Sequence, residues 1–414
     1  MSIRSSCSDG GAAAKGSMIQ TLAIAHYRSL RELIVPLGQL NVITGANGSG
    51  KTNLYRALRL LADTAQGGVI ASLAREGGLD STLWAGVSEP TQGMRQSMRK
   101  GSARFEGSKR KEPVNLRLGF ASDTLSYSIE LGLPIPSPGL ESAVSRFSRD
   151  PQIKRECIWV GTKLRPSALV ADRRNGVVRL RDSAGDWEVA RQSLPLFDSL
   201  LMEVSDANRA PEVLSLRDQI RSWRFYDHFR VDPDAPARQP QLGTRTPVLS
   251  HDGRDVAAAL QTIHEIGDAA GLDAAVSDAF PGCHISIADV DGRFDIEMHQ
   301  RGLLRPLRSA ELSDGTLRSL LWIAALLTPR PPALMVLDEP EMSLHPDLLP
   351  AFARLIIHAA KSTQIWVISH SSRLVAALAE APECQSIVLE KETGETRVAG
   401  RGVLDQPPWE WPAR

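Results

Sequence analysis

Hydrophobic positions along the chain form two kinds of run, and each kind predicts a different element. Apolar runs at 333–337 and 365–368, and a run at 40–43 that is apolar except for Asn41, predict strands buried on both faces, as in a parallel sheet covered by helices. Runs that alternate apolar and polar residues, at 114–120 and 125–133, predict antiparallel strands with one face toward the core. The chain is therefore expected to be an α/β protein with a mixed sheet and an antiparallel β lobe.

Further elements follow from turn residues and helical periodicity. Asn175-Gly176 tolerates the positive φ of a tight turn and predicts a hairpin. Pro211 opens an amphipathic helix that ends in an aromatic and basic cluster at 224–230, which we interpret as packing between lobes, with a ligand or partner surface as the alternative. Between 67 and 111 the periodicity fades. The other predicted elements are strands at 18–25, 33–35, 285–288 and 294–298, an extended loop at 231–247, and helices at 53–61, 255–266, 273–280 and 319–327.

The sequence Gly-Ala-Asn-Gly-Ser-Gly-Lys-Thr at 45–52 stands between a predicted strand and a predicted helix. A phosphate-binding loop requires this order, because its glycines let backbone N–H groups face phosphate oxygens and the helix directs its positive end at them. Lys51 is expected to reach the β- and γ-phosphates, and the Thr52 hydroxyl to bind Mg²⁺. The alternative, a chance match in a Gly-rich turn, is disfavoured by the correct flanks. The residues expected to contact ATP here are Asn47, Gly48, Ser49, Gly50, Lys51 and Thr52.

Two other predicted strands end in residues suited to ATP chemistry. Asp338 and Glu339 follow the run at 333–337, and ligands collect at the carboxyl ends of parallel strands. Asp338 is expected to hold Mg²⁺, directly or through water, and Glu339 to polarise the attacking water. His370 follows the run at 365–368. A lone His is usually structural, but this position favours contact with the γ-phosphate.

A second anion-binding feature precedes the helix at 319–327. The sequence Leu-Ser-Asp-Gly-Thr at 312–316 places Ser313 and Gly315 at a helix start, which favours a bound anion. Within one copy of the chain this feature has no obvious partner. A two-fold dimer, in which Ser313 and Gly315 of each copy close over the ATP of the other, provides one. We therefore expect a homodimer to form on ATP binding.

Taken in order, these motifs resemble the heads of ABC-type ATPases, and most of all the RecF/SMC/OLD branch of predicted AAA_21-type ATPases. The resemblance covers about 18–61 and 300–390. It includes Leu-Asp-Glu-Pro-Glu at 337–341 and Ser-Leu-His-Pro at 343–346, and Tyr-Arg-Ser-Leu at 27–30 is also similar.

The resemblance implies a P-loop NTPase fold of ABC/SMC head type with a helical or irregular insertion. It also implies a nucleotide-sandwich dimer in which Ser313 and Gly315 act in trans, residues 343–346 cross the seam and His370 senses the γ-phosphate. Arg28, in the segment similar to that branch, is expected among the nucleotide contacts.

The chain departs from the pattern of that branch in three ways. The glutamine that usually links Mg²⁺ to the insertion has no clear equivalent, and Gln92 and Gln96 are only candidates. No heptad run is long enough for a coiled-coil arm. The chain after His370 is too short for the Toprim nuclease of OLD proteins, so nuclease activity in cis is not expected.

The overall charge of the chain does not indicate a nucleic-acid partner. Lys+Arg and Asp+Glu are both 48 in 414 residues, so any contact with nucleic acid must be local. The stretch 95–111 is basic, which predicts a solvated loop or a contact with the DNA backbone. The scattered cysteines suit a reducing cytoplasm, and no apolar run approaches the roughly 18 residues of a membrane span.

These observations lead to one preferred function and two alternatives. The preferred one is an ATP-hydrolysing switch in DNA repair or anti-phage defence, acting with DNA or with a separately encoded nuclease or effector. The alternatives are the nucleotide-binding subunit of a membrane transporter and an ATP-dependent regulatory scaffold. The expected division is a disordered leader at 1–17, a first part of the head at 18–90, a β lobe and insertion at 91–300, the second part of the head at 301–400 and a tail at 401–414.

Overall fold

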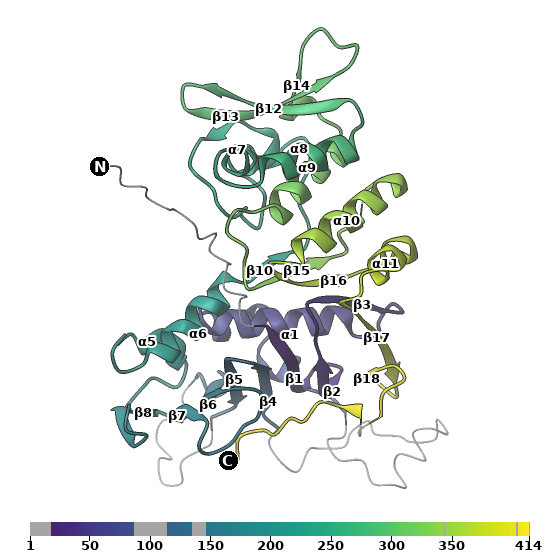
Figure 1. The fold of residues 1–414 in the computed structure, drawn as a ribbon. Coiled ribbons are helices and arrows are strands. Elements are labelled where there is room, and N and C mark those ends of the chain that lie inside the picture. The colour runs from purple at the N-terminus through teal and green to yellow at the C-terminus, as the bar shows by residue number, and fades with distance from the viewer. Residues whose placement is uncertain (1–17, 87–113, 135–145, 343, 403–404, 414) are drawn as a thin grey trace, which may run out of the picture.

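The computed structural model describes residues 18–86, 114–134, 146–342, 344–402 and 405–413. They are arranged in layers (Figure 1). An antiparallel sheet is covered by helix α1, a central sheet lies on the other side of α1, and a layer of helices and a small third sheet follow. The expected α/β class, with a mixed sheet and an antiparallel lobe, is confirmed.

The central sheet has the strand order β10-β15-β16-β3-β17-β18, and only β18 runs antiparallel to its neighbour. Its strands are β3 (Leu40–Gly45), β10 (Arg224–Tyr226), β15 (Leu334–Asp338), β16 (Gln364–Ile368), β17 (Cys384–Glu392) and β18 (Glu395–Val398). Leu334 and Val336 of β15 face one hydrophobic core, whereas Met335 and Leu337 face a second core on the other side. Both faces are therefore buried, as the apolar runs predicted.

The antiparallel sheet has the order β2-β1-β4-β5-β6-β7-β8-β9 and packs its inner face against α1 (Lys51–Thr64). Its strands are β1 (Ile19–Tyr27), β2 (Leu30–Pro36), β4 (Leu116–Ser122), β5 (Leu125–Gly132), β6 (Gln152–Val160), β7 (Leu169–Arg174), β8 (Val177–Arg181) and β9 (Trp187–Arg191). The hairpin predicted at Asn175-Gly176 joins β7 to β8, and Asn175 has the positive φ (50°) that its turn requires.

Helices cover the other face of the central sheet. The elements of this half are α7 (Val256–Ile266), α8 (Ala269–Ala279), α9 (Asp314–Leu326), α10 (Leu349–Ala359) and α11 (Ser372–Ala379), with β11 (Gln241–Leu242), β12 (Cys283–Val290), β13 (Arg293–Gln300) and β14 (Leu307–Arg308) in the third sheet. Helix α8 begins earlier than the helix predicted at 273–280, because Asp268 caps it by accepting from the backbone N–H of Gly271.

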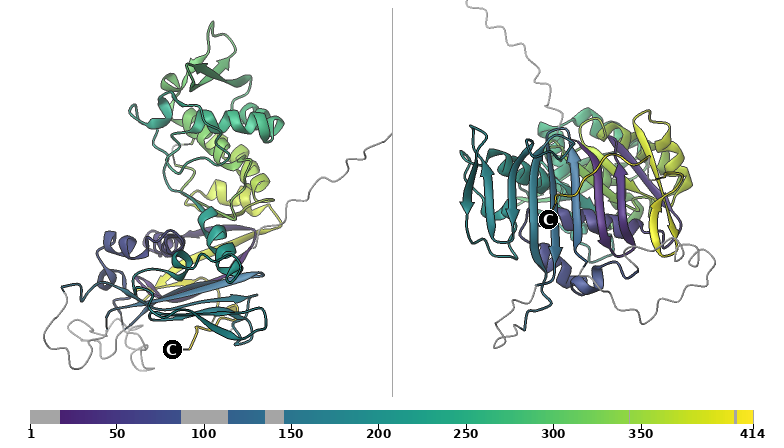
Figure 2. Two further views of the ribbon diagram at one scale, coloured as in Figure 1. Left: turned by 90° about the vertical axis from the view of Figure 1, so that its left-hand side faces the viewer. Right: turned by 90° about the horizontal axis from the view of Figure 1, so that it is seen from below.

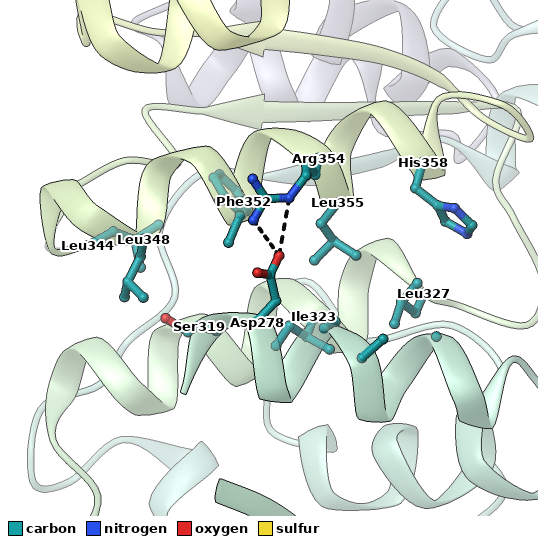
Figure 3. A pocket seen from close by; sticks show the side chains of 15 residues that line it. Asp278, Ser319, Ile323, Leu327, Leu344, Leu348, Phe352, Arg354, Leu355 and His358 are labelled. Atoms are coloured by element: carbon teal, nitrogen blue, oxygen red, sulfur yellow. Dashed lines mark hydrogen bonds and ion pairs between the residues drawn. The ribbon is translucent and has the colours of Figure 1, made fainter. Parts of the chain in front are cut away.

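An apolar cavity of about 390 Å³ lies between α8, α9 and α10 (Figure 3). Phe352, Leu355 and Ile323 are among the side chains that line it, and the ion pair of Arg354 with Asp278 (2.6 Å) joins α10 to α8 beside it.

Several elements differ from the expectation or were not expected. The region after residue 67, where periodicity fades, contains α2 (Val69–Arg75) and α3 (Leu79–Thr82). The cluster at 224–230 supplies β10 to the central sheet in addition to the expected packing, in which Phe229 contacts Trp322 with ring centroids 4.8 Å apart. The amphipathic helix before it is α6 (Pro211–Ser222), and a short helix α5 (Leu200–Glu203) precedes that.

The C-terminal residues 405–413 lie across the outer face of the antiparallel sheet (Figure 2). Trp409 packs against Trp159 of β6, with ring centroids 5.7 Å apart. A Cβ on Gly119 of β4 would stand 2.7 Å from the Trp409 ring, so the absence of a side chain there makes room for the indole. The tail therefore covers the apolar side chain of Trp159 on the outer face of this sheet.

A buried ion pair stabilises the antiparallel sheet and gives the first prediction. Glu156 and Arg173 are fully buried and paired at 2.7 Å, and Glu156 also accepts from Tyr127, Ser199 and the backbone of Leu200. Replacing Glu156 by Ala leaves the buried guanidinium of Arg173 without its carboxylate partner. We therefore expect a loss of about 3–5 kcal/mol in the free energy of unfolding. Urea denaturation measures it.

The matched control is Glu188→Ala, which removes an exposed ion pair with Arg209. It should cost no more than about 1 kcal/mol. Equal losses in the free energy of unfolding for the two variants would show that the buried pair contributes no more to stability than the exposed one.

Candidate nucleotide-binding site

The phosphate loop joins β3 to α1, and two of its glycines are required by the close approach of neighbouring strands. Gly45 has a φ of 147° and Gly50 a φ of 111°. A Cβ on Gly45 would stand 2.3 Å from the carbonyl oxygen of Leu389, and one on Gly50 would stand 2.2 Å from Oγ1 of Thr396. A side chain at either position would displace the loop from β17 and β18.

Lys51 is the first residue of α1, and its side chain folds back into the loop. Nζ donates to the carbonyl oxygens of Gly45 (2.7 Å) and Ala46 (3.1 Å). Burial lowers the pKa of Lys51, while the carboxylates of Glu339 and Asp338 oppose that shift. The ammonium is thus held inside the loop, where phosphate oxygens could take the place of the two carbonyls.

A chain of hydrogen bonds supports the loop from behind. Asn53 Nδ2 donates to Ser29 Oγ (2.8 Å), Ser29 Oγ bonds to Thr396 Oγ1 (2.7 Å), and Thr396 Oγ1 donates to the Ser49 carbonyl (2.8 Å). The Ser49 hydroxyl is buried without a hydrogen-bond partner among the described residues. An orphaned hydroxyl here suits a loop that binds phosphate. Thr396 was not predicted from the sequence, because it is 347 positions from Ser49.

Asp338, Glu339 and His370 meet beside the phosphate loop because their strands are parallel neighbours. Asp338 at the end of β15 is in register with Ile368 of β16, and Ile368 is in register with Ile43 of β3. Glu339 has a φ of 48°, which is unusual for a residue other than glycine, and its backbone N–H donates to Ile368. Its Oε1 lies 3.5 Å from His370 Nε2. The turn therefore aims Glu339 toward His370 at the carboxyl edge of the sheet.

Glu341 fixes the segment that carries His370. One carboxylate oxygen accepts from Ser369 Oγ (2.7 Å), from the backbone N–H of His370 (2.8 Å) and from that of Ser371 (3.0 Å). Glu341 belongs to the motif at 337–341, but its role could not be predicted from the sequence. The structure shows that it ties the turn after β15 to the turn after β16.

Asp227 adds an acid that sequence reasoning missed. It follows β10, which pairs with β15, and it accepts from Arg59 (2.8 Å) and from the Tyr55 hydroxyl of α1. With Thr52 and Asp338 it lines a cavity of about 560 Å³. An acid directly after the aromatic residues Phe225 and Tyr226 was the available signal, but the cluster around it favoured packing instead.

The acids around Asp338 define where a divalent cation could bind. Burial, then the nearby charges of Glu339, Asp227 and Glu341, raise the pKa of Asp338 to about 6. The Thr52 hydroxyl and the Asp338 carboxylate line the same cavity, and such oxygen ligands fit Mg²⁺. Bound there with ATP, Mg²⁺ would neutralise phosphate charge. Among the described residues no three His, Cys, Asp or Glu side chains form a ready metal cluster, so substrate oxygens would complete the coordination.

The raised pKa of Asp338 predicts a pH dependence of Mg²⁺ binding. Above about pH 6 the carboxylate is ionised and free for the cation, whereas below it the proton competes. We expect the Asp338 contribution to Mg²⁺ affinity to weaken about tenfold by about pH 5. Mg²⁺ titrations with a fluorescent ATP analogue, compared with Asp338→Asn, separate this effect from the titration of ATP itself. Equal pH profiles for the two proteins would contradict it.

Arg28 lies in the turn between β1 and β2 and has a φ of 47°. Its guanidinium pairs with Glu76 (2.8 Å), which also accepts from the Tyr27 hydroxyl (2.6 Å). Glu76 lines the same cavity as Thr52 and Asp338. Arg28 is thus near this cavity but bound to an acid, and a nucleotide contact for it stays a prediction.

Ser313 and Gly315 form the start of α9. Ser313 Oγ accepts from the backbone N–H of Thr316 (3.1 Å), so it caps the helix as its position predicted. Gly315 lies in the first turn, with its carbonyl bonded to Ser319 Oγ (2.8 Å). Gln92, Gln96, the basic stretch 95–111 and Ser343 lie outside the described residues.

Comparison with known proteins gives three results. The family model described as "AAA domain, putative AbiEii toxin, Type IV TA system" matches residues 40–167 and 180–376. The DNA replication and repair protein RecF of Idiomarina loihiensis is 35% identical over 82 residues, which are 19% of this chain and 23% of that protein. The chain therefore aligns with about a quarter of that relative's length.

Solved structures that are similar in outline include two SMC heads. One is bound to the C-winged helix domain of ScpA, with 14% identity, a TM-score of 0.46 and coverage of 94% of this chain and 99% of that one. The other, from Thermotoga maritima, has 14% identity, a TM-score of 0.42 and coverage of 93% and 100%. Within the described residues, no helix is both long enough and apolar enough to cross a membrane.

The family match covers well over half of the chain and contains the phosphate loop, the acidic turn after β15, the start of α9 and His370. The chain belongs to the AAA_21 family of ATPase domains, with RecF among its relatives.

Proposed function

We propose that this protein binds Mg²⁺-ATP in the phosphate loop and hydrolyses it in a homodimer whose two copies share each site. The proposal rests on one observation: four side chains suited to ATP chemistry lie at one edge of the central sheet, namely those of Lys51, Asp338, Glu339 and His370. The charges of both acids act on the Lys51 ammonium. Asn47, Gly48, Ser49, Gly50 and Thr52 would surround the phosphates. Ser313 and Gly315 of the partner copy would close the site.

Each residue has a chemical task in this proposal. Lys51 would bind the β- and γ-phosphates, and Thr52 and Asp338 would hold Mg²⁺. Glu339 would accept a proton from the attacking water, and His370, 3.5 Å from it, would contact the γ-phosphate. Glu341 would keep His370 in place through the three hydrogen bonds to its segment.

We further propose that the ATP cycle serves DNA repair or anti-phage defence. The similarity to a RecF protein supports the first, and the family description, which names a putative toxin of a toxin–antitoxin system, supports the second. ATP binding would join two copies and hydrolysis would release them, moving DNA or a separately encoded partner.

Steady-state ATP hydrolysis with and without duplex DNA, at two salt concentrations, tests this assignment. Stimulation by DNA that fades as salt rises is expected if the protein contacts the phosphate backbone. Hydrolysis that is indifferent to DNA would leave the ATPase in place and direct the search to a protein partner. Absence of hydrolysis under all these conditions would favour the regulatory scaffold.

A further inference from the structure

The segment 227–238 connects the candidate Mg²⁺ end of the site to the loop that precedes α9. It starts at Asp227, which lines the cavity with Thr52 and Asp338. It ends at Arg238, whose side chain is only 7% exposed although the segment is rich in proline and polar residues. A buried guanidinium at the end of such a segment requires partners.

Arg238 finds its partners in the loop 309–314. Nη1 donates to the carbonyl oxygens of Ser309 (3.3 Å), Ala310 (3.4 Å) and Leu312 (2.7 Å), and Nη2 donates to Asp314 Oδ1 (2.5 Å). Nε donates to Val231 within its own segment (2.7 Å). All three guanidinium nitrogens are therefore engaged, which the planar fork of arginine permits and an ammonium does not.

These contacts have a consequence for the start of α9. Because three carbonyl groups of the loop turn toward the buried Arg238, the loop is held in one shape up to Leu312. Ser313 caps α9 next in the chain and is exposed, and Asp314, which pairs with Arg238, is 65% exposed. The positive end of α9 is thereby left open to an anion from outside this copy.

Arg318 of α9 makes a second connection to the same segment. It is buried, and Nη1 donates to the carbonyl oxygen of Met342 (2.7 Å) while Nη2 donates to that of Phe229 (3.4 Å). Met342 lies just beyond Glu339 and Glu341, and Phe229 lies two residues after Asp227. Helix α9 is thus bonded to the segments that follow both acid-bearing strands, β15 and β10.

We propose that Arg238 is a positioning residue, which shapes the loop 309–314 (the Ser313 loop) to receive the ATP of the partner copy. The segment 227–238 and Arg318 link that loop to the nucleotide site of the same copy. This inference rests on the proposed shared site. It predicts that Arg238 governs ATP-dependent association and not the binding of ATP to the phosphate loop of its own chain.

The test uses the full chain carrying Glu339→Gln, so that bound ATP persists. The affinity for a fluorescent ATP analogue is measured at low protein concentration, and association is measured by sedimentation velocity with ATP. Adding Arg238→Gln should leave the affinity within about twofold and weaken ATP-dependent dimerisation more than about tenfold, because several hydrogen bonds to a charged group are lost. The matched control is Arg230→Gln, in which an exposed arginine of the same segment, paired with Asp232, is replaced; association should not change.

Arg238→Lys is the second variant if Arg238→Gln fails to fold, since it keeps a positive charge at this position but cannot make the bonds of the guanidinium to the loop 309–314. It should weaken association with unchanged ATP affinity. The inference is overturned if either folded variant dimerises like its parent, or if ATP affinity falls in parallel with dimerisation. If the Glu339→Gln parent stays monomeric with ATP, the proposed shared site is contradicted, and this inference fails with it.

Discussion

Glu339→Gln is expected to slow ATP hydrolysis by about 10²–10⁴-fold while ATP still binds, because the amide cannot take the proton of the attacking water. The amide has nearly the shape of the carboxylate, so the turn with its φ of 48° and the bond from its N–H to Ile368 should persist. Phosphate release at saturating Mg²⁺-ATP measures the rate, and a fluorescent ATP analogue measures binding.

Glu380→Gln is the matched control, since Glu380 is exposed at the end of α11. It should hydrolyse ATP at the parental rate. If Glu339→Gln also does so, Glu339 is not the general base, and His370 becomes the candidate to examine next.

Lys51→Ala is expected to weaken ATP binding by about 10- to 100-fold, since hydrogen bonds to a charged group contribute about 1.5–3 kcal/mol. Nζ already lies 2.7 Å and 3.1 Å from two loop carbonyls, so the ammonium has no large movement to make when phosphates arrive. Removing it also takes away a positive charge that acts on Asp338 and Glu339. Titration of the fluorescent ATP analogue gives the affinity.

Lys361→Ala, at an exposed position after α10, controls for the loss of a positive charge. It should bind ATP like the parent. Unchanged binding by Lys51→Ala would contradict the assignment of the phosphate loop as the principal triphosphate contact.

Local sequence could predict the parts of the site that lie within short motifs. The run at 333–337 is apolar because β15 is buried on both faces, and the residues that follow it must lie at the carboxyl edge of a parallel sheet. The same logic placed His370 after β16. Because β16 pairs with β15 on one side and with β3 on the other, the ends of β15 and β16 lie beside the phosphate loop that follows β3.

Contacts between distant segments could not be predicted in this way. Thr396 supports the phosphate loop from a strand near the other end of the chain, and nothing in its neighbourhood differs from an ordinary edge hairpin. Asp227 depends on β10, which has only three residues and carries no clear period. The bonds of Arg238 to the Ser313 loop depend on a proline-rich segment that sequence reasoning described only as extended.

The most direct test of a site shared by two copies is to mix two inactive variants. Lys51→Ala removes the phosphate-loop half, and Gly315→Asp places an anion at the start of α9, where it suits the helix dipole but repels the partner's triphosphate. Each variant alone should be nearly inactive. Mixed in equal amounts, they should recover about one quarter of the parental hydrolysis rate, because half of the dimers are mixed and each of these holds one complete site. A mixture as inactive as its components would contradict the shared site.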